Sequence, residues 1–144
     1  MTLTKNHSTI NKQSTKINKA FGGSSSPNVN TKNNVTFNNS NNMTKITIYQ
    51  MKLNKENHFY CYSGLDMLQR HNLTVDINRY NIVYIRELDE KVKNVYMLLE
   101  SLFEEFNLRH PKDFHGHSLS VSDIVKVNRT YYYCDSFGWK KIRF

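Results

Sequence analysis

The chain has 144 residues, with 20 lysine and arginine residues against 12 aspartate and glutamate residues, which gives a formal net charge of +8. This length fits one domain, and the basic balance excludes an acidic protein that imitates DNA over its whole surface. No apolar run approaches the ~18 residues of a membrane-spanning helix. We also expect no signal peptide, and therefore a soluble, intracellular protein without membrane contact.

Residues 1–42 differ in composition from the rest of the chain. They are rich in Asn, Ser and Thr and contain five lysines but no acid, which leaves 15 basic and 12 acidic groups, a net charge of +3, for residues 43–144. Such a segment buries too little apolar surface to offset the entropy lost on ordering, about 1–2 kcal/mol per residue. We predict a disordered basic tail over 1–42 and one compact domain over 43–144. Within the tail, residues 8–21 space Ile10, Ile17 and Phe21 as on a helix, so this stretch either folds on a partner or is a plain linker.

The domain begins with a predicted hairpin and a short helix. Residues 46–53, ITIYQMKL, alternate apolar and polar side chains, which is typical of a half-buried strand. Residues 54–57 supply turn residues, and 58–62, HFYCY, read as the returning strand. Ser63 is a plausible N-cap for a helix over 64–71.

A strand and a longer helix follow. Residues 80–88, YNIVYIREL, carry an apolar run that predicts a well-buried central strand. From Glu90 to about Asn107, apolar residues recur at intervals of three and four, which predicts a helix that packs one face on the core. Pro111 prevents the helix from continuing.

The last quarter of the chain, His110–Phe144, predicts a polar loop and a second hairpin. Its strands are expected at 124–127 and 131–134, with the turn at Asn128 and Arg129. The predicted fold class is therefore α+β: a small antiparallel sheet with two helices, in the order ββαβα followed by two or three strands, preceded by the disordered tail.

Potential metal-binding and catalytic residues gather in this loop. His110, His115 and His117 lie near Asp123 and Cys134, but their spacing matches no zinc signature. Histidine, serine and aspartate are also the ingredients of acid–base catalysis, yet a catalytic centre is defined by geometry and not by composition. We predict no catalytic residue, no metal and no cofactor, and we expect the two cysteines, Cys61 and Cys134, to be reduced.

The chain end combines aromatic and basic side chains. Trp139 stands beside three cations, and at least one tyrosine of 131–133 should point away from the core face. This combination suits a phosphate-and-base contact or a hydrophobic anchor with a basic rim. The alternative is that Trp139 closes the core and the cations are simply solvated. The predicted partner-binding residues are Trp139, Lys140, Lys141, Arg143 and Tyr132.

Two blocks, GHSLSVSD at 116–123 and YYYCDSFGW at 131–139, resemble the YodL-like domain, and the similarity extends over roughly Met43 to Phe144. The resemblance implies an accessory protein of plasmids, integrative elements or phages of Gram-positive bacteria, often encoded near genes that counteract restriction or CRISPR defence. It supplies no catalytic residues.

Three function classes follow from these observations. The first is a non-catalytic anti-defence protein, in the cytoplasm of a bacterial host cell, that binds and inhibits a host immunity nuclease: a CRISPR effector or its guide RNA complex. The second is a basic nucleic-acid-binding accessory or regulatory protein of a plasmid or phage, with possible nucleic-acid contact through the tail lysines. The third is an enzyme, such as a nuclease that uses His117 or Asp123.

Overall fold

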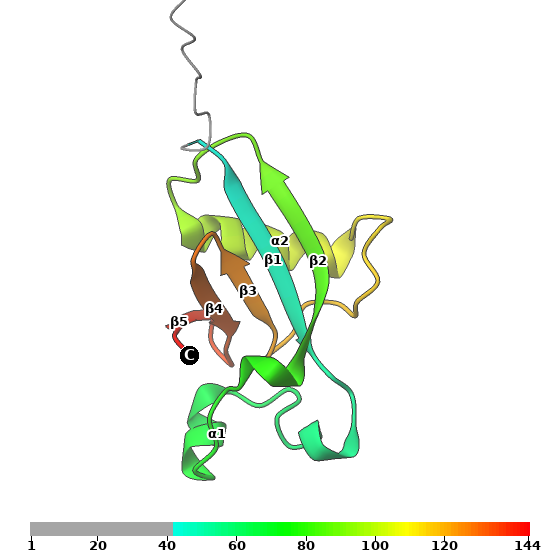
Figure 1. Cartoon of the computed structure of the whole chain (residues 1–144), viewed down its shortest axis with the longest axis vertical. Coiled ribbons are helices and arrows are strands. Elements are labelled where there is room, and N and C mark those ends of the chain that lie inside the picture. The colour runs from blue at the N-terminus through cyan, green and yellow to red at the C-terminus, as the bar shows by residue number, and fades with distance from the viewer. Residues whose placement is uncertain (1–41) are drawn as a thin grey trace, which may run out of the picture. The chain divides into compact units, whose positions relative to one another are not determined.

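The computed structural model describes residues 42–144, so the predictions for the tail fall outside the described residues. The order of elements is β1 (Thr44–Met51), α1 (Leu65–Arg70), β2 (Tyr80–Leu88), α2 (Val95–Leu108), β3 (Ile124–Val127), β4 (Thr130–Cys134) and β5 (Trp139–Ile142). Short 3₁₀ helices lie at Lys55–Asn57 and Ile77–Arg79. The five strands form one antiparallel sheet (Figure 1), which confirms the predicted α+β class with two helices.

The strand order is β2-β1-β3-β4-β5, which places β1 inside the sheet and β2 at its edge. Ile46 of β1 pairs with Arg86 of β2 on one side and with Val127 of β3 on the other. The prediction of a central strand at 80–88 is therefore wrong. Ile46 is 0% exposed, whereas Ile82 and Ile85 of β2 are 54% and 51% exposed, because neither helix covers that part of the edge strand.

The predicted returning strand at 58–62 is also wrong, and the observed order is βαβαβββ. The backbone N–H groups of Tyr60 and Cys61 both donate to the carbonyl oxygen of Asn57, and the N–H of Ser63 donates to the carbonyl oxygen of Tyr60. These groups therefore bond within a turn. β1 already has a strand on each side, so no edge of β1 is open to this segment.

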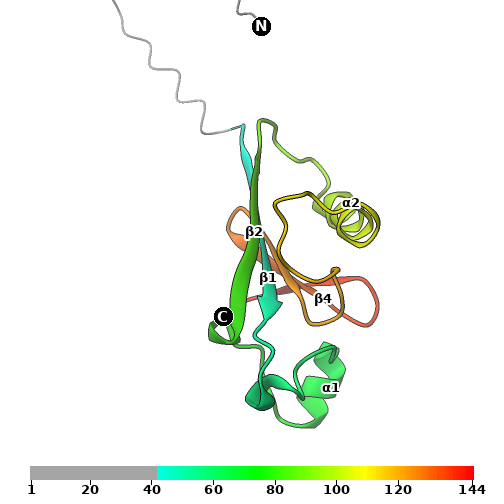
Figure 2. The same cartoon turned by 90° about the vertical axis from the view of Figure 1, so that its right-hand side faces the viewer.

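The long helix α2 covers one face of the sheet, as Figure 2 shows. Its Leu99, Leu102 and Phe106 are buried against the apolar side chains of β1 and β3. The helix begins five residues later than predicted, because the Asn94 side chain accepts the N–H of Met97 as an N-cap. Neither helix among residues 42–144 is long and apolar enough to cross a membrane.

The helix α1 and its flanking loops lie at the end of the sheet where β1 finishes and β2 starts (Figures 1 and 2). They pack on the side of the sheet opposite α2, around Leu68, Ile124 and Tyr133. The predicted N-cap residue Ser63 does not cap this helix: the N-cap position is Gly64, and the N–H of Leu65 donates to the Asp135 side chain, 2.9 Å away. The remainder of this face of the sheet, toward β2 and the chain end, is not covered by a helix.

Candidate binding surfaces and the His117 network

The residues predicted to bind a partner are divided by the fold. Trp139 and Tyr132 lie in the core under α2, with only 7% and 8% of their surface exposed. Lys140, Lys141 and Arg143 are exposed on the edge strand β5 and the residues that follow it. None of these three cations is within 4.0 Å of an acidic side chain among residues 42–144. The cations are thus the members of the predicted set that are accessible to a partner.

An apolar hollow of about 560 Å³ lies between α1 and β5, and we call it the α1–β5 hollow. Its floor is mainly aliphatic, and Arg143 contributes a cation to its lining. The lining residues are Leu65, Leu68, Gln69, Asn72, Leu73, Thr74, Val75, Ile142 and Arg143. A hollow of this kind suits an apolar side chain of a protein partner, with charged contacts at its edge.

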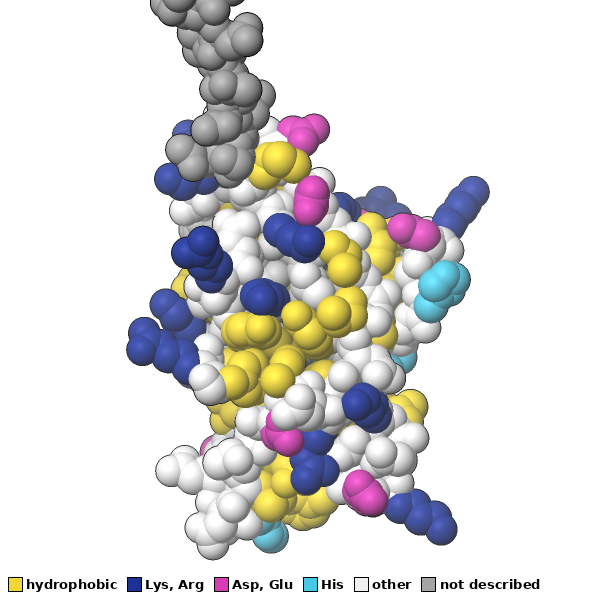
Figure 3. Space-filling model, in the orientation of Figure 1, with side chains coloured by type: hydrophobic (Ala, Val, Ile, Leu, Met, Phe, Trp, Pro, Cys, Tyr) yellow, Lys and Arg dark blue, Asp and Glu magenta, His cyan; other side chains and the backbone are white. Residues whose placement is uncertain are grey.

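The part of the sheet that faces away from α2 and is left open by α1 is called the free face. It carries a row of three aromatic rings: Tyr49 of β1, Tyr131 of β4, and Phe144. The ring centroids of Tyr49 and Tyr131 are 6.0 Å apart, and those of Tyr131 and Phe144 are 5.0 Å apart. The Lys126 ammonium group on β3 lies 4.7 Å from the centroid of the Tyr131 ring. Figure 3 shows hydrophobic side chains gathered at the centre of this face, with Lys and Arg side chains around them.

The free face ends in a second hollow, beside Phe144, with a volume of about 380 Å³. Two aromatic rings, Tyr131 and Phe144, line it together with three cations: Arg129, Lys141 and Arg143. Aromatic faces next to cations attract flat, electron-rich rings and negatively charged groups.

The 116–123 segment folds around a buried carboxyl group. Asp123 is 1% exposed, and one of its oxygens, Oδ2, accepts hydrogen bonds from the Ser120 N–H at 2.9 Å and from Gln50 Nε2 at 3.0 Å. Gln50 Nε2 also donates to the His117 carbonyl oxygen at 2.7 Å, and Gln50 Oε1 accepts the His117 N–H at 3.0 Å. We call Gln50, His117, Ser120 and Asp123 the His117 network. It ties the loop before β3 to the strand β1.

Both ring nitrogens of His117 face protein groups. Nδ1 lies 2.7 Å from the Ser118 carbonyl oxygen and 3.2 Å from Gln50 Nε2. Nε2 lies 3.8 Å from Asp123 Oδ1, an oxygen without a hydrogen-bond partner among residues 42–144. Burial raises the pKa of Asp123 to about 6, although His117 and the bonds from Ser120 and Gln50 act in the opposite direction. At 3.8 Å the His117 ring and the Asp123 carboxyl interact through their charges without a hydrogen bond, and neither residue lines a hollow described above.

Backbone geometry is unusual next to this network. Ser122 and Tyr62 have φ of 81° and 62°, in the left-handed region that residues with a side chain seldom adopt. The Tyr62 N–H donates to Ser122 Oγ at 3.0 Å, and the Tyr80 hydroxyl donates to the Ser122 carbonyl oxygen at 3.0 Å. These bonds hold Ser122 in a conformation that places Asp123 inward.

The three loop histidines do not meet. His110 and His115 are exposed, and only His117 belongs to the network. Within residues 42–144, no group of three His, Cys, Asp or Glu side chains is placed to hold a metal ion. Cys61 and Cys134 are both free, and burial raises the pKa of each thiol.

The sequence model of the YodL-like domain matches residues 45–144, which include almost all of β1 and every later element. The chain belongs to the YodL-like domain family. Its GHSLSVSD block, which carries the resemblance, is the segment that folds around Asp123 in the His117 network. No curated protein and no solved structure matches this YodL-like chain.

Several residues of the His117 network and the free face of this YodL-like domain were not predicted from the sequence. Nothing in the sequence marked Gln50 as a site residue, yet it is 3% exposed and bonded to His117 and Asp123. Tyr49 and Lys126 come to the free face only because β1 and β3 are neighbours. Phe144 joins them by folding beside Tyr131. No local pattern signals these long-range pairings.

Proposed function

We propose that this YodL-like domain is a non-catalytic anti-defence protein of a mobile genetic element that binds and inhibits a host immunity nuclease, with a CRISPR RNA-guided nuclease as the expected target. The observation that carries the proposal is the α1–β5 hollow beside exposed cations that have no acidic partner within residues 42–144. The family resemblance supports the mobile-element setting.

The surface at β5 fits a protein partner with an acidic patch next to a protruding apolar side chain. The α1–β5 hollow offers Leu65, Leu73 and Val75 for that side chain. Lys140 and Lys141 on β5 offer charges that steer an acidic patch into place. The formal net charge of +8 argues against imitation of DNA, so inhibition would proceed by blocking a protein surface or a conformational step of the nuclease.

The absence of enzymatic activity is part of this proposal. The ring nitrogens of His117 both face protein groups, at 2.7 Å and 3.8 Å, so neither is directed at a bound substrate. A general base must be within hydrogen-bond reach of the proton that it removes. The His117 network therefore supports a structural role for His117 and Asp123, the two residues that the enzyme hypothesis would use.

Charge reversal on β5 tests the proposal. The assay is target cleavage by a reconstituted CRISPR RNA-guided nuclease from a Gram-positive bacterium, which the wild-type full chain should inhibit. The double variant Lys140→Glu, Lys141→Glu should inhibit at least about tenfold less well, because two attractive contacts become repulsive. The double variant Lys91→Glu, Lys93→Glu makes the same change of charge at two exposed positions between β2 and α2, and should inhibit like the wild type.

Affinity capture from a Gram-positive lysate supplies the second measurement. With the wild-type full chain as bait, one defence nuclease should be recovered, and recovery should survive treatment of the lysate with DNase and RNase. Recovery that disappears on this treatment, together with no inhibition of cleavage by the wild-type chain, would refute the proposal and favour a nucleic-acid-binding accessory protein.

A further inference from the structure

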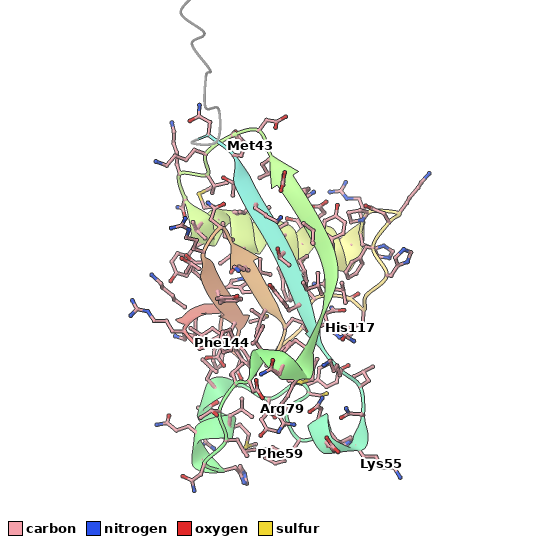
Figure 4. All side chains as sticks on the ribbon, viewed as in Figure 1. Met43, Lys55, Phe59, Arg79, His117 and Phe144 are labelled. Carbon is pink, nitrogen blue, oxygen red and sulfur yellow. The ribbon has the colours of Figure 1, made fainter. Side chains whose placement is uncertain are left out.

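We propose that the free face of the sheet is a binding site for single-stranded nucleic acid, with bases stacked on the row Tyr49, Tyr131 and Phe144. This goes beyond the function proposed above, because it assigns another ligand class to a surface that adjoins the α1–β5 hollow and shares Ile142 and Arg143 with it. In Figure 4, Phe144 lies to the left of the central strands and His117 to their right, so Phe144 does not adjoin the His117 network.

The aromatic row is held in place by the strands. Tyr49 and Tyr131 lie on β1 and β4, on either side of β3, and side chains of a sheet stand roughly perpendicular to it. The rings are inclined to each other, by 51° for Tyr49 and Tyr131 and by 83° for Tyr131 and Phe144. They therefore do not stack in one closed column. Phe144 is 55% exposed and offers the most open ring of the three.

The charge of the free face suits phosphate groups. Lys126 lies within the row, and Arg129 and Arg143 line the hollow beside Phe144. None of these three cations is within 4.0 Å of an acidic side chain in the described part of the chain. The acid Glu87 of β2, opposite Lys45, is engaged with it at 3.4 Å. A bound strand would thus meet cations that are not already neutralised.

The combination favours an unpaired strand over a duplex. Aromatic side chains stack on base faces, and those faces are accessible only when the bases are unpaired. The hollow of about 380 Å³ beside Phe144 places two rings and three cations around one space, which matches a nucleotide that has both a flat base and a phosphate. The exposed Ile82 and Ile85 extend the apolar floor of the free face toward β2.

The test is fluorescence anisotropy with the full chain and a labelled 12-nucleotide single strand, as DNA and as RNA, against a duplex of the same sequence. The tail lysines attract phosphates of both forms, so the readout is the ratio of single-strand to duplex affinity. Phe144→Ala should lower single-strand affinity about tenfold and leave duplex affinity unchanged, because one stacking contact is lost. Phe144→Trp should restore or raise single-strand affinity.

Phe137→Ala is the matched control, since Phe137 is 90% exposed but lies in the turn between β4 and β5. It should bind like the wild type. Lys126→Glu should weaken binding and reduce its dependence on salt, and circular dichroism should show both Phe144 variants folded. Equal affinity of the wild type for single strand and duplex, or an equal effect of Phe144→Ala and Phe137→Ala, would overturn the inference. A difference between the DNA and RNA arms identifies which strand the site prefers.

Discussion

Replacement of Gln50 by alanine is expected to lower the free energy of unfolding by about 3–5 kcal/mol, which is a large share of the 5–15 kcal/mol typical of a domain. The side chain is 3% exposed and bonds to the backbone N–H and carbonyl of His117 and to Asp123 Oδ2. Truncation leaves the His117 N–H and carbonyl without their partner and removes one of the two bonds to Asp123 Oδ2, which keeps the bond from Ser120. Each unpaired group costs about 1–3 kcal/mol. Urea unfolding followed by circular dichroism measures the change.

Gln69→Ala is the matched control for this variant. Gln69 undergoes the same chemical change on the exposed surface of α1, where the effect should stay within about 0.5 kcal/mol. A loss below about 1 kcal/mol for Gln50→Ala would contradict the role given to Gln50, because it would mean that the loop before β3 holds its conformation without the bridge to β1.

The stability of the domain is expected to fall as the pH rises from about 4 to about 6, because of Asp123. Its pKa is about 6 in the folded protein, against 3.8 for an ordinary aspartate, since burial disfavours the charged carboxylate. In this window the folded state holds the proton more tightly than the unfolded state, so deprotonation favours unfolding. The contribution is at most about 3 kcal/mol, because a shift of one pKa unit corresponds to about 1.4 kcal/mol. This shift already includes the opposing effect of the nearby His117.

Asp123→Asn isolates this effect. The amide retains an oxygen that accepts the bonds from Ser120 and Gln50, and its NH₂ group can face Nε2 of His117. The variant should lose the Asp123 part of the pH dependence and should be at least as stable as the wild type at pH 8. Asp113→Asn, at an exposed aspartate, should retain the wild-type dependence in urea unfolding at pH 4.5 and 8. An unchanged slope in Asp123→Asn would show that another group causes it.

Local patterns predicted the elements whose pairing is local. The hairpin of β3 and β4 is confirmed, with Lys126 opposite Tyr131, because Asn128 tolerates the φ of 55° that the tight turn requires. The stripe of apolar residues on α2 is confirmed as the core face by Leu99, Leu102 and Phe106. In both cases the residues that make the contacts are close in sequence or repeat with a regular period.

Elements whose environment depends on distant segments were predicted less well. Residues 58–62 have the composition of a strand, but their amide groups bond within a turn because β1 has no free edge. The apolar run in 80–88 suggested burial on both sides, yet the strand lies at the sheet edge and leaves Ile82 and Ile85 exposed. Strand order is a property of the whole chain, so no short window of sequence contains it.

The same distinction holds for the candidate sites. The sequence by itself determined the basic, exposed character of Lys140, Lys141 and Arg143, the helical core face and the YodL-like signature at 116–123, because these depend on composition and short spacing. Only the tertiary structure decided that Trp139 is buried and that Gln50 reaches Asp123, 73 residues away in the chain. It also decided that Tyr49, Lys126, Tyr131 and Phe144 share one surface, because strand pairing brings together side chains that are remote in sequence.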